Sequence, residues 1–210
     1  MAVSFDLFGT LVERVDSGGD DDPAARVAAE LAARDVAVPD DWAAAYRERH
    51  IDAPEGAEVP LPAHVSAALA SRGVDAPGNA ARRAVVAAFD PEVRTCDGAV
   101  DAVTAARAVG PVALCSNCSV PELVGRTLVR SALSRDDFDA VVSSVGCGWR
   151  KPAAEMFETT ATRLDVAPAD LVHVGDDART DGGIEALGGQ FVDVAEVPLT
   201  ALPDELGWSR

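Results

Sequence analysis

The chain has 210 residues, of which 48% are hydrophobic, and 35 acidic against 18 basic residues give it a formal net charge of −17. This length and apolar content suit one sizeable domain, or a core domain that carries a smaller insert. An acidic surface repels nucleic acid and anionic membranes, and the sequence contains no basic, apolar leader and no run of eighteen apolar residues. We therefore expect a soluble, cytoplasmic protein; the composition does not indicate the oligomeric state.

The charged residues are of unusual types. The basic residues are 17 arginines and one lysine, Lys151, and aspartate outnumbers glutamate. Such a composition is typical of proteins from a salt-rich cytoplasm, where counterions screen the self-repulsion. A GC-rich coding bias, which favours Ala, Asp and Arg over Lys, is an alternative explanation. Neither explanation bears on the chemistry of the protein.

The N-terminal half begins with a buried strand over residues 3–5, which Asp6 ends. A turn rich in glycine and aspartate follows over 16–22. Helical spacing of apolar residues, with proline or polar residues at the starts, then predicts four helices without an intervening strand. These helices cover residues 23–34, about 42–50, 63–71 and 79–89. We expect residues 14–93 to form a small helical domain.

From Cys96 onward, short apolar runs alternate with helical patterns. Strands are predicted over 111–115, 138–143, 171–174 and 190–194, and helices over 97–109, 121–131, 152–164 and 181–187. This alternation indicates βαβ units and a parallel sheet. Residues 1–13 and 94–210 are thus expected to form an α/β core domain, a Rossmann-like, doubly wound parallel sheet.

Polar residues follow three of the predicted strands. Asp6 ends the first strand, Ser116 and Asn117 end another, and Gly175-Asp176-Asp177 with Asp181 follows a third. Open α/β sheets build their sites at the carboxyl ends of the strands. Carboxylates that meet there would repel one another strongly unless a cation lay between them, and Mg²⁺ prefers such oxygen ligands. The sequence therefore predicts a Mg²⁺ site at this edge.

Lys151 is the only lysine of the chain and stands in Gly148-Trp149-Arg150-Lys151-Pro152, ahead of a predicted helix. In a chain that otherwise uses arginine, a retained lysine indicates a position that a planar guanidinium does not fit. A compact ammonium can place a point charge beside a carboxylate or another anionic group. We expect Lys151 to belong to the site.

Four segments, in this order, resemble the motifs of the haloacid dehalogenase-like (HAD) hydrolases. They are Asp6-Leu7-Phe8-Gly9-Thr10-Leu11, the apolar strand that ends at Ser116, Lys151-Pro152, and Gly175-Asp176-Asp177 with Asp181. The resemblance implies that Asp6 is the nucleophile and that the helical segment is a cap domain inserted after the first motif. It also implies a phosphatase that acts on a small phosphorylated metabolite.

The same resemblance implies the roles of the site residues. The catalytic residues would be Asp6, Ser116, Asn117 and Lys151. The ligands of Mg²⁺ would be Asp6, the Phe8 carbonyl and Asp176, with support from Asp177 or Asp181. Substrate would be bound by Thr10, Ser116, Asn117, Lys151 and Arg47.

Phe8 departs from the family pattern, because HAD phosphatases have a second aspartate two residues after the nucleophile. That aspartate protonates the leaving oxygen, which phenylalanine cannot do. An aromatic residue at this position resembles the 2-haloacid dehalogenases, in which Arg47 or Arg49 could bind the substrate carboxylate. The acidic fourth motif nevertheless favours the phosphatase. A third alternative is a binding protein that has lost turnover.

The chain contains four cysteines, and Cys115 and Cys118 have C-x-x-C spacing. No second such pair accompanies them, as a zinc site would require. We expect ordinary reduced thiols in the protein interior.

Overall fold

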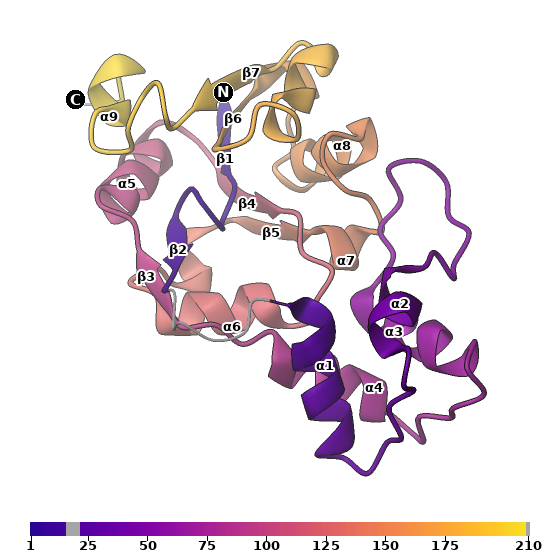
Figure 1. Cartoon of the computed structure of the whole chain (residues 1–210). Coiled ribbons are helices and arrows are strands. Elements are labelled where there is room, and N and C mark those ends of the chain that lie inside the picture. The colour runs from indigo at the N-terminus through magenta and orange to yellow at the C-terminus, as the bar shows by residue number, and fades with distance from the viewer. Residues whose placement is uncertain (16–21, 209–210) are drawn as a thin grey trace.

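A computed structural model describes residues 1–15 and 22–208 of the chain. The turn predicted over 16–22 lies almost wholly outside the described residues. Five strands form one parallel sheet in the order β5-β4-β1-β6-β7 (Figure 1). They are β1 (Ala2–Phe5), β4 (Val112–Ser116), β5 (Ala140–Ser143), β6 (Leu171–Gly175) and β7 (Gln190–Asp193). The prediction of an α/β fold with a parallel sheet is confirmed.

Alternate residues of the buried strands point to opposite faces of the sheet, as pleating requires. On β1, Val3 and Phe5 belong to one apolar cluster and Ala2 belongs to a second. Helices α5 (Ala99–Val109) and α6 (Leu123–Arg130) contribute to the first cluster, and α8 (Ala154–Arg163) contributes to the second. Helices therefore cover both faces, and β1 lies at the centre of a doubly wound sheet.

The segment between the first strands and α5 is mostly helical. It contains α1 (Pro23–Ala32), α2 (Trp42–Arg47), α3 (Leu61–Ala70) and α4 (Ala80–Ala88). The Asp22 side chain caps α1 by accepting from the N–H of Ala24, and the indole of Trp42 donates to the Ala24 carbonyl at 2.8 Å. Helix α1 packs against α4 and α2, and α3 packs against α4 and α2, so the four form one group beside the sheet (Figure 1). That this group is a separate cap domain stays a prediction.

Several elements differ from those predicted. Strands β2 (Val12–Arg14) and β3 (Val93–Thr95) pair in an antiparallel ribbon at the base of the helical segment, which the prediction treated as free of strands. The short helices α7 (Ser144–Cys147) and α9 (Leu202–Glu205) and the 3₁₀ turns η1 (Arg135–Asp137) and η2 (Pro168–Asp170) were also not predicted.

The helix predicted over 181–187 is the 3₁₀ helix η3 (Asp181–Leu187). Two adjacent glycines weaken helical propensity there. A Cβ at Gly183 would lie 2.6 Å from the carbonyl oxygen of Pro152, so this position needs a glycine to let the segment approach the lysine loop.

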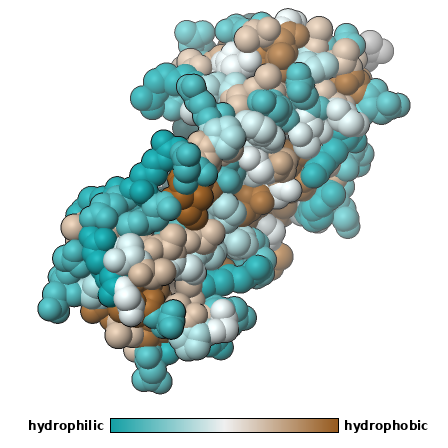
Figure 2. Space-filling model, turned by 90° about the vertical axis from the view of Figure 1, so that its right-hand side faces the viewer, coloured by the Kyte–Doolittle hydropathy of each residue, from teal (hydrophilic) through white to brown (hydrophobic). Residues whose placement is uncertain are grey.

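Hydrophilic residues cover most of the molecular face seen in Figure 2, and hydrophobic residues form small patches between them. Among the described residues, no helix has both the length and the apolar character needed to cross a membrane.

Candidate active site

Asp6 lies at the carboxyl end of the central strand, where its backbone N–H donates to the Val174 carbonyl at 2.9 Å. The chain then turns back, and the N–H groups of Leu11 and Val12 both donate to the Leu7 carbonyl. Gly9 makes this turn possible with a φ of +87°. A Cβ at Gly9 would lie 2.2 Å from a carboxylate oxygen of Asp176, so the absence of a side chain lets the turn approach that carboxylate.

Lys151 lies at the centre of the site with a side chain that is only 1% exposed. Its Nζ is 3.0 Å from Asp6 Oδ1 and 2.5 Å from Asp181 Oδ1, and it donates to the Cys115 carbonyl at 2.9 Å. Burial alone would lower the pKa of Lys151, but the carboxylates of Asp6 and Asp181 raise it to about 12. The ammonium is therefore charged at neutral pH and joins the two carboxylates.

His173 extends this group below the surface, although sequence analysis did not identify it. Its Nε2 is 3.1 Å from Asp181 Oδ1 and its Nδ1 is 2.8 Å from Ser4 Oγ. Burial, and then the neighbouring ammonium of Lys151, lower the pKa of His173. The ring is thus neutral, and the network assigns its proton to Nε2, where it is donated to Asp181, while Nδ1 accepts from Ser4.

A signal for this pair is present in the sequence. Ser4 and His173 are polar residues within otherwise apolar strands, and they are Cα partners in the register of β1 and β6. Two polar residues that face each other across adjacent buried strands are expected to bond. Without the strand order, however, their register could not be known.

Three carboxylates converge at this edge of the sheet. One oxygen each of Asp6, Asp176 and Asp181 lies within 4.8 Å of the others. Burial would raise the pKa of Asp181, but the hydrogen bond from His173 and the ammonium of Lys151 hold it well below its usual range. The pKa of Asp176 is raised, first by desolvation and then by the charges of Asp6 and Asp181.

These residues fit a hard divalent cation. The ligand atoms are carboxylate oxygens, the set that Mg²⁺ prefers. Lys151 offsets only part of their negative charge, and the Asp6 Oδ1 accepts no hydrogen bond from any described residue although Nζ lies near it. The pKa of Asp176 is raised first by desolvation and then by the charges of Asp6 and Asp181, and a bound cation would favour its ionised form.

The two residues after β4 have different environments. Ser116 is buried, and its Oγ has no hydrogen-bond partner within the described part of the chain, so its hydroxyl is free for a substrate oxygen. The Asn117 side chain is instead engaged with the Lys151 backbone: it accepts from the N–H at 2.8 Å and donates to the carbonyl at 3.0 Å. Asn117 thus ties the serine loop to the lysine loop.

The remaining residues of the first motif lie beside this group. Thr10 is buried, and its Oγ1 is 3.4 Å from Asp176 Oδ1. Phe8 is half-buried against the apolar core, and the Arg14 guanidinium lies over its ring at 5.2 Å from the centroid. A cation therefore lies beside the side chain that stands in place of the usual acid.

Two predicted residues are not among the converging groups. The Asp177 carboxylate is paired with Arg179 at 2.9 Å, and only its backbone N–H takes part, donating to Asp181 at 3.0 Å. Arg47 contacts Asp22 and the carbonyl of Ala43, within the helical segment.

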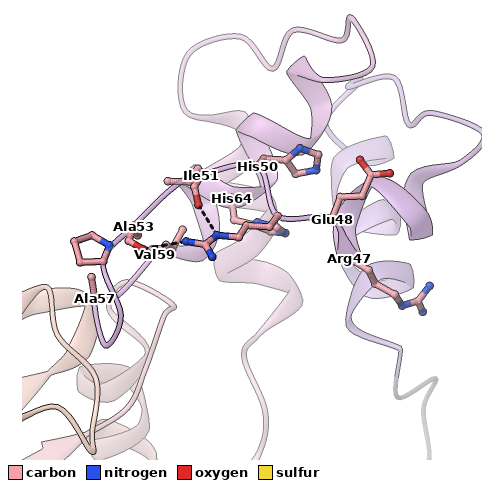
Figure 3. A pocket seen from close by; sticks show the side chains of 10 residues that line it. Arg47, Glu48, His50, Ile51, Ala53, Ala57, Val59 and His64 are labelled. Carbon is pink, nitrogen blue, oxygen red and sulfur yellow. Dashed lines mark hydrogen bonds between the residues drawn. The ribbon is translucent and has the colours of Figure 1, made fainter.

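Arg47 borders a pocket of about 350 Å³ between α2 and the loop that leads to α3. In Figure 3 its side chain points away from the imidazoles of His50 and His64, which also line the pocket. Arg47 therefore borders the same pocket as these two imidazoles, but its guanidinium is not directed toward them.

The four cysteines are free thiols, and Cys115 and Cys118 are buried. Burial raises the pKa of Cys115 to about 11 and also raises that of Cys118. Neither is an activated thiolate at neutral pH.

The fold and the converging carboxylates define a doubly wound α/β protein with an acidic site at the carboxyl edge of its sheet. The family model of haloacid dehalogenase-like hydrolases matches residues 1–188, and the chain belongs to this family of hydrolases. None of the curated proteins matches the chain in sequence.

Solved structures share the fold. A HAD phosphatase from Thermococcus onnurineus aligns with a TM-score of 0.60 and 18% identity, over 100% of this chain and 99% of that one. A mutant of CbbY from Rhodobacter sphaeroides in complex with xylulose-1,5-bisphosphate has a TM-score of 0.58 and 19% identity, over 90% and 84%. The L-2-haloacid dehalogenase from Xanthobacter autotrophicus has a TM-score of 0.53 and 20% identity, over 100% and 83%. Because the similar structures include both phosphatases and a dehalogenase, the fold does not distinguish between these two reactions, and only the residues of the site can do so.

Proposed function

We propose that the protein is a Mg²⁺-dependent phosphatase that acts on a small phosphorylated metabolite through a phosphorylated Asp6. The convergence of Asp6, Asp176 and Asp181 within 4.8 Å carries this proposal. A site that displaced halide without a metal would not need the additional carboxylate of Asp176 beside Asp6 and Asp181. Asp6 and Asp176 would hold the metal, and Asp181 would support it while pairing with Lys151.

In the proposed reaction the Asp6 carboxylate attacks phosphorus, and the bond to the leaving oxygen breaks with its electron pair going to that oxygen. Lys151 and the free hydroxyl of Ser116 hold the phosphoryl oxygens as charge develops on them. Water then attacks phosphorus, which releases phosphate and restores the Asp6 carboxylate. Mg²⁺ held by Asp6 and Asp176 would supply positive charge that offsets the charge developing on the phosphoryl group.

Phe8 narrows the range of suitable substrates. General acid catalysis contributes about 10²–10⁴-fold in rate, and phenylalanine cannot supply it. Phosphates with good leaving groups, such as aryl and acyl phosphates, lose little of this rate without the acid. We therefore place the substrate among phosphorylated metabolites whose leaving group departs without a proton.

The test is hydrolysis of an aryl phosphate by the purified protein with Mg²⁺. Turnover is expected to stop with EDTA and in Asp6→Asn, and to continue in the control Asp177→Asn, because the Asp177 carboxylate is paired with Arg179 outside the converging group. Turnover that survives Asp6→Asn would refute the role of Asp6 as the nucleophile.

A 2-haloacid dehalogenase is a second candidate. A halide leaving group needs no proton, so this reaction does not require a general acid at the position of Phe8. Asp6 would attack carbon, the carbon–halogen bond would break with release of halide, and water would hydrolyse the resulting ester. Halide release from 2-chloropropionate that EDTA leaves unchanged would favour this candidate over the phosphatase. Metabolite binding without turnover on either substrate class would instead favour a binding protein.

A further inference from the structure

Glu58 is a buried carboxylate that the proposed reaction does not use. It lies in the loop between α2 and α3, and its side chain is only 1% exposed. Arg150 Nη1 lies 2.9 Å from its Oε2, and the Ser144 hydroxyl donates to the same oxygen. A buried charge of this kind is costly, and well-packed apolar residues are often as stable or more so. Packing alone therefore does not account for Glu58.

Its two partners belong to the loop that leads to Lys151. Ser144 begins α7, and Arg150 directly precedes the lysine. Both partners also contact the loop after β4: Ser144 Oγ accepts from the N–H of Cys118 at 2.8 Å, and Arg150 Nη1 donates to Ser119 Oγ at 2.9 Å. Glu58 thus bonds to the two side chains that join the lysine loop to the serine loop.

The backbone around Glu58 is fixed to the same loop. The N–H of Glu58 donates to the Gly148 carbonyl at 2.8 Å, and the N–H of Arg150 donates to the Gly56 carbonyl at 2.8 Å. An isolated antiparallel bridge pairs Ala57 with Trp149. This short antiparallel backbone pairing therefore holds the Glu58 carboxylate next to its partners.

We propose that Glu58 is a positioning residue that fixes the placement of Lys151 relative to Ser116 and Asp6. It does so through Ser144 and Arg150, which close the gap between the two loops, while Asn117 ties the same loops at the lysine itself. The helical segment thereby contributes to the geometry of the site without touching the reacting atoms. The inference rests on the site roles of Lys151 and Ser116 in the proposed function.

The single lysine allows a test that does not depend on turnover. Protein labelled with ¹³C at lysine Cε gives one NMR resonance, that of Lys151, because the sequence contains no other lysine. Glu58→Gln keeps the shape and an acceptor for Ser144 but removes the charge facing Arg150. We expect the resonance to shift or to split into two conformers in a protein that remains folded by circular dichroism.

The matched control is Glu48→Gln, which removes an exposed carboxylate of the same helical segment that pairs with Arg72. The Lys151 resonance is expected to stay unchanged in that variant. For an aryl phosphate, Glu58→Gln should lower kcat about tenfold with KM within about twofold, because Lys151 and Ser116 act mainly on charge that develops in the transition state. Glu48→Gln should leave both constants unchanged.

Ser144→Ala provides a second route if Glu58→Gln does not fold, because it removes one link of the same network and should move the lysine resonance in the same way. A folded Glu58→Gln or Ser144→Ala variant with an unmoved resonance and an unchanged kcat overturns the inference. If the parent protein hydrolyses no phosphate ester but the resonance still moves, the proposed function fails while the positioning role stands.

Discussion

Two ion-pair clusters of the chain each consist of one cationic side chain between two carboxylates. One cluster is buried, and the carboxylates of the other are exposed to water. Lys151 contacts Asp6 and Asp181 with side chains that are 1–12% exposed. Arg72, on the helical segment, contacts Asp41 at 2.9 Å and Glu48 at 2.6 Å, and these carboxylates are 56% and 49% exposed. The buried cluster also has partners around it, namely His173 on Asp181 and the Cys115 carbonyl on Lys151.

The difference shows what burial requires of a charged group. Water solvates the two carboxylates of the exposed cluster, so its ion pairs contribute little to stability. The buried cluster has lost that water, and each charge depends on the groups around it. The buried cluster therefore holds its charged groups in fixed positions away from water, as a chemical site requires, whereas the carboxylates of the exposed cluster stay in contact with water.

Removing the buried cation should have the largest effect. Lys151→Met leaves Asp6 and Asp181 without their ammonium, and we expect the free energy of unfolding to fall by roughly 3–5 kcal/mol. Urea denaturation measures this value, with Arg72→Met as the matched control. A loss no larger than that of the control would show that the buried cluster is as weakly coupled as the exposed one.

The second largest effect is expected from adding Mg²⁺, which should stabilise the buried cluster and not the exposed one. Mg²⁺ at about 100 times its dissociation constant should raise the free energy of unfolding by about 2.7 kcal/mol, because it binds only the folded site. Asp176→Asn should abolish this gain, and Asp177→Asn should retain it. Thermal melts with and without Mg²⁺ measure the effect, and an equal gain in both variants would contradict the assigned ligands.

The pH dependence of the buried cluster is the third comparison. The folded-state pKa of Asp181 lies below its ordinary value of 3.8, so the stability it contributes is present above pH 3.8 and is lost as the pH falls below it. The loss amounts to about 1.4 kcal/mol for each unit by which the pKa is lowered. Unfolding of the parent and of Asp181→Asn should therefore differ less as acid is added. A difference that is constant across this range would contradict the buried pairing.

Breaking the exposed cluster should have the smallest effect. We expect Arg72→Ala to change the melting temperature by only about 1–2 °C, because exposed pairs are weak and screened. The change should vanish in about 1 M salt, where the screening length is roughly 3 Å. A larger shift that persists in salt would show that Arg72 packs a structural element instead.

The sequence predicts the sheet and the position of the site because apolar runs define the strands and strand ends meet at one edge. Asp6, Ser116 and Asp176 could be found in this way, and Lys151 could be found as the single lysine of the chain. The choice between Asp177 and Asp181 could not, because it depends on the Asp181 carboxylate packing over Gly175, where a Cβ would lie 2.3 Å from it.

Elements that form only by pairing with residues distant in the sequence could not be predicted from the sequence. Strands β2 and β3 have three residues each and pair Val12 with Thr95, so neither has a local pattern of its own. Glu58 looks like any loop carboxylate in an acidic chain until the fold brings Ser144 and Arg150 to it. Local patterns locate elements, whereas a buried polar network is specified only by the complete fold.

Because Lys151 is buried and is the only lysine, its chemical modification can be followed without interference from other lysines. In most proteins an amine-acylating reagent modifies many exposed lysines, and the reaction of any one of them is hidden among the rest. Here every other basic side chain except histidine is an arginine, which such reagents leave intact, and Lys151 is 3% exposed. The rate at which the lysine side chain is acylated, followed by mass spectrometry, therefore reports how often the site opens to solvent.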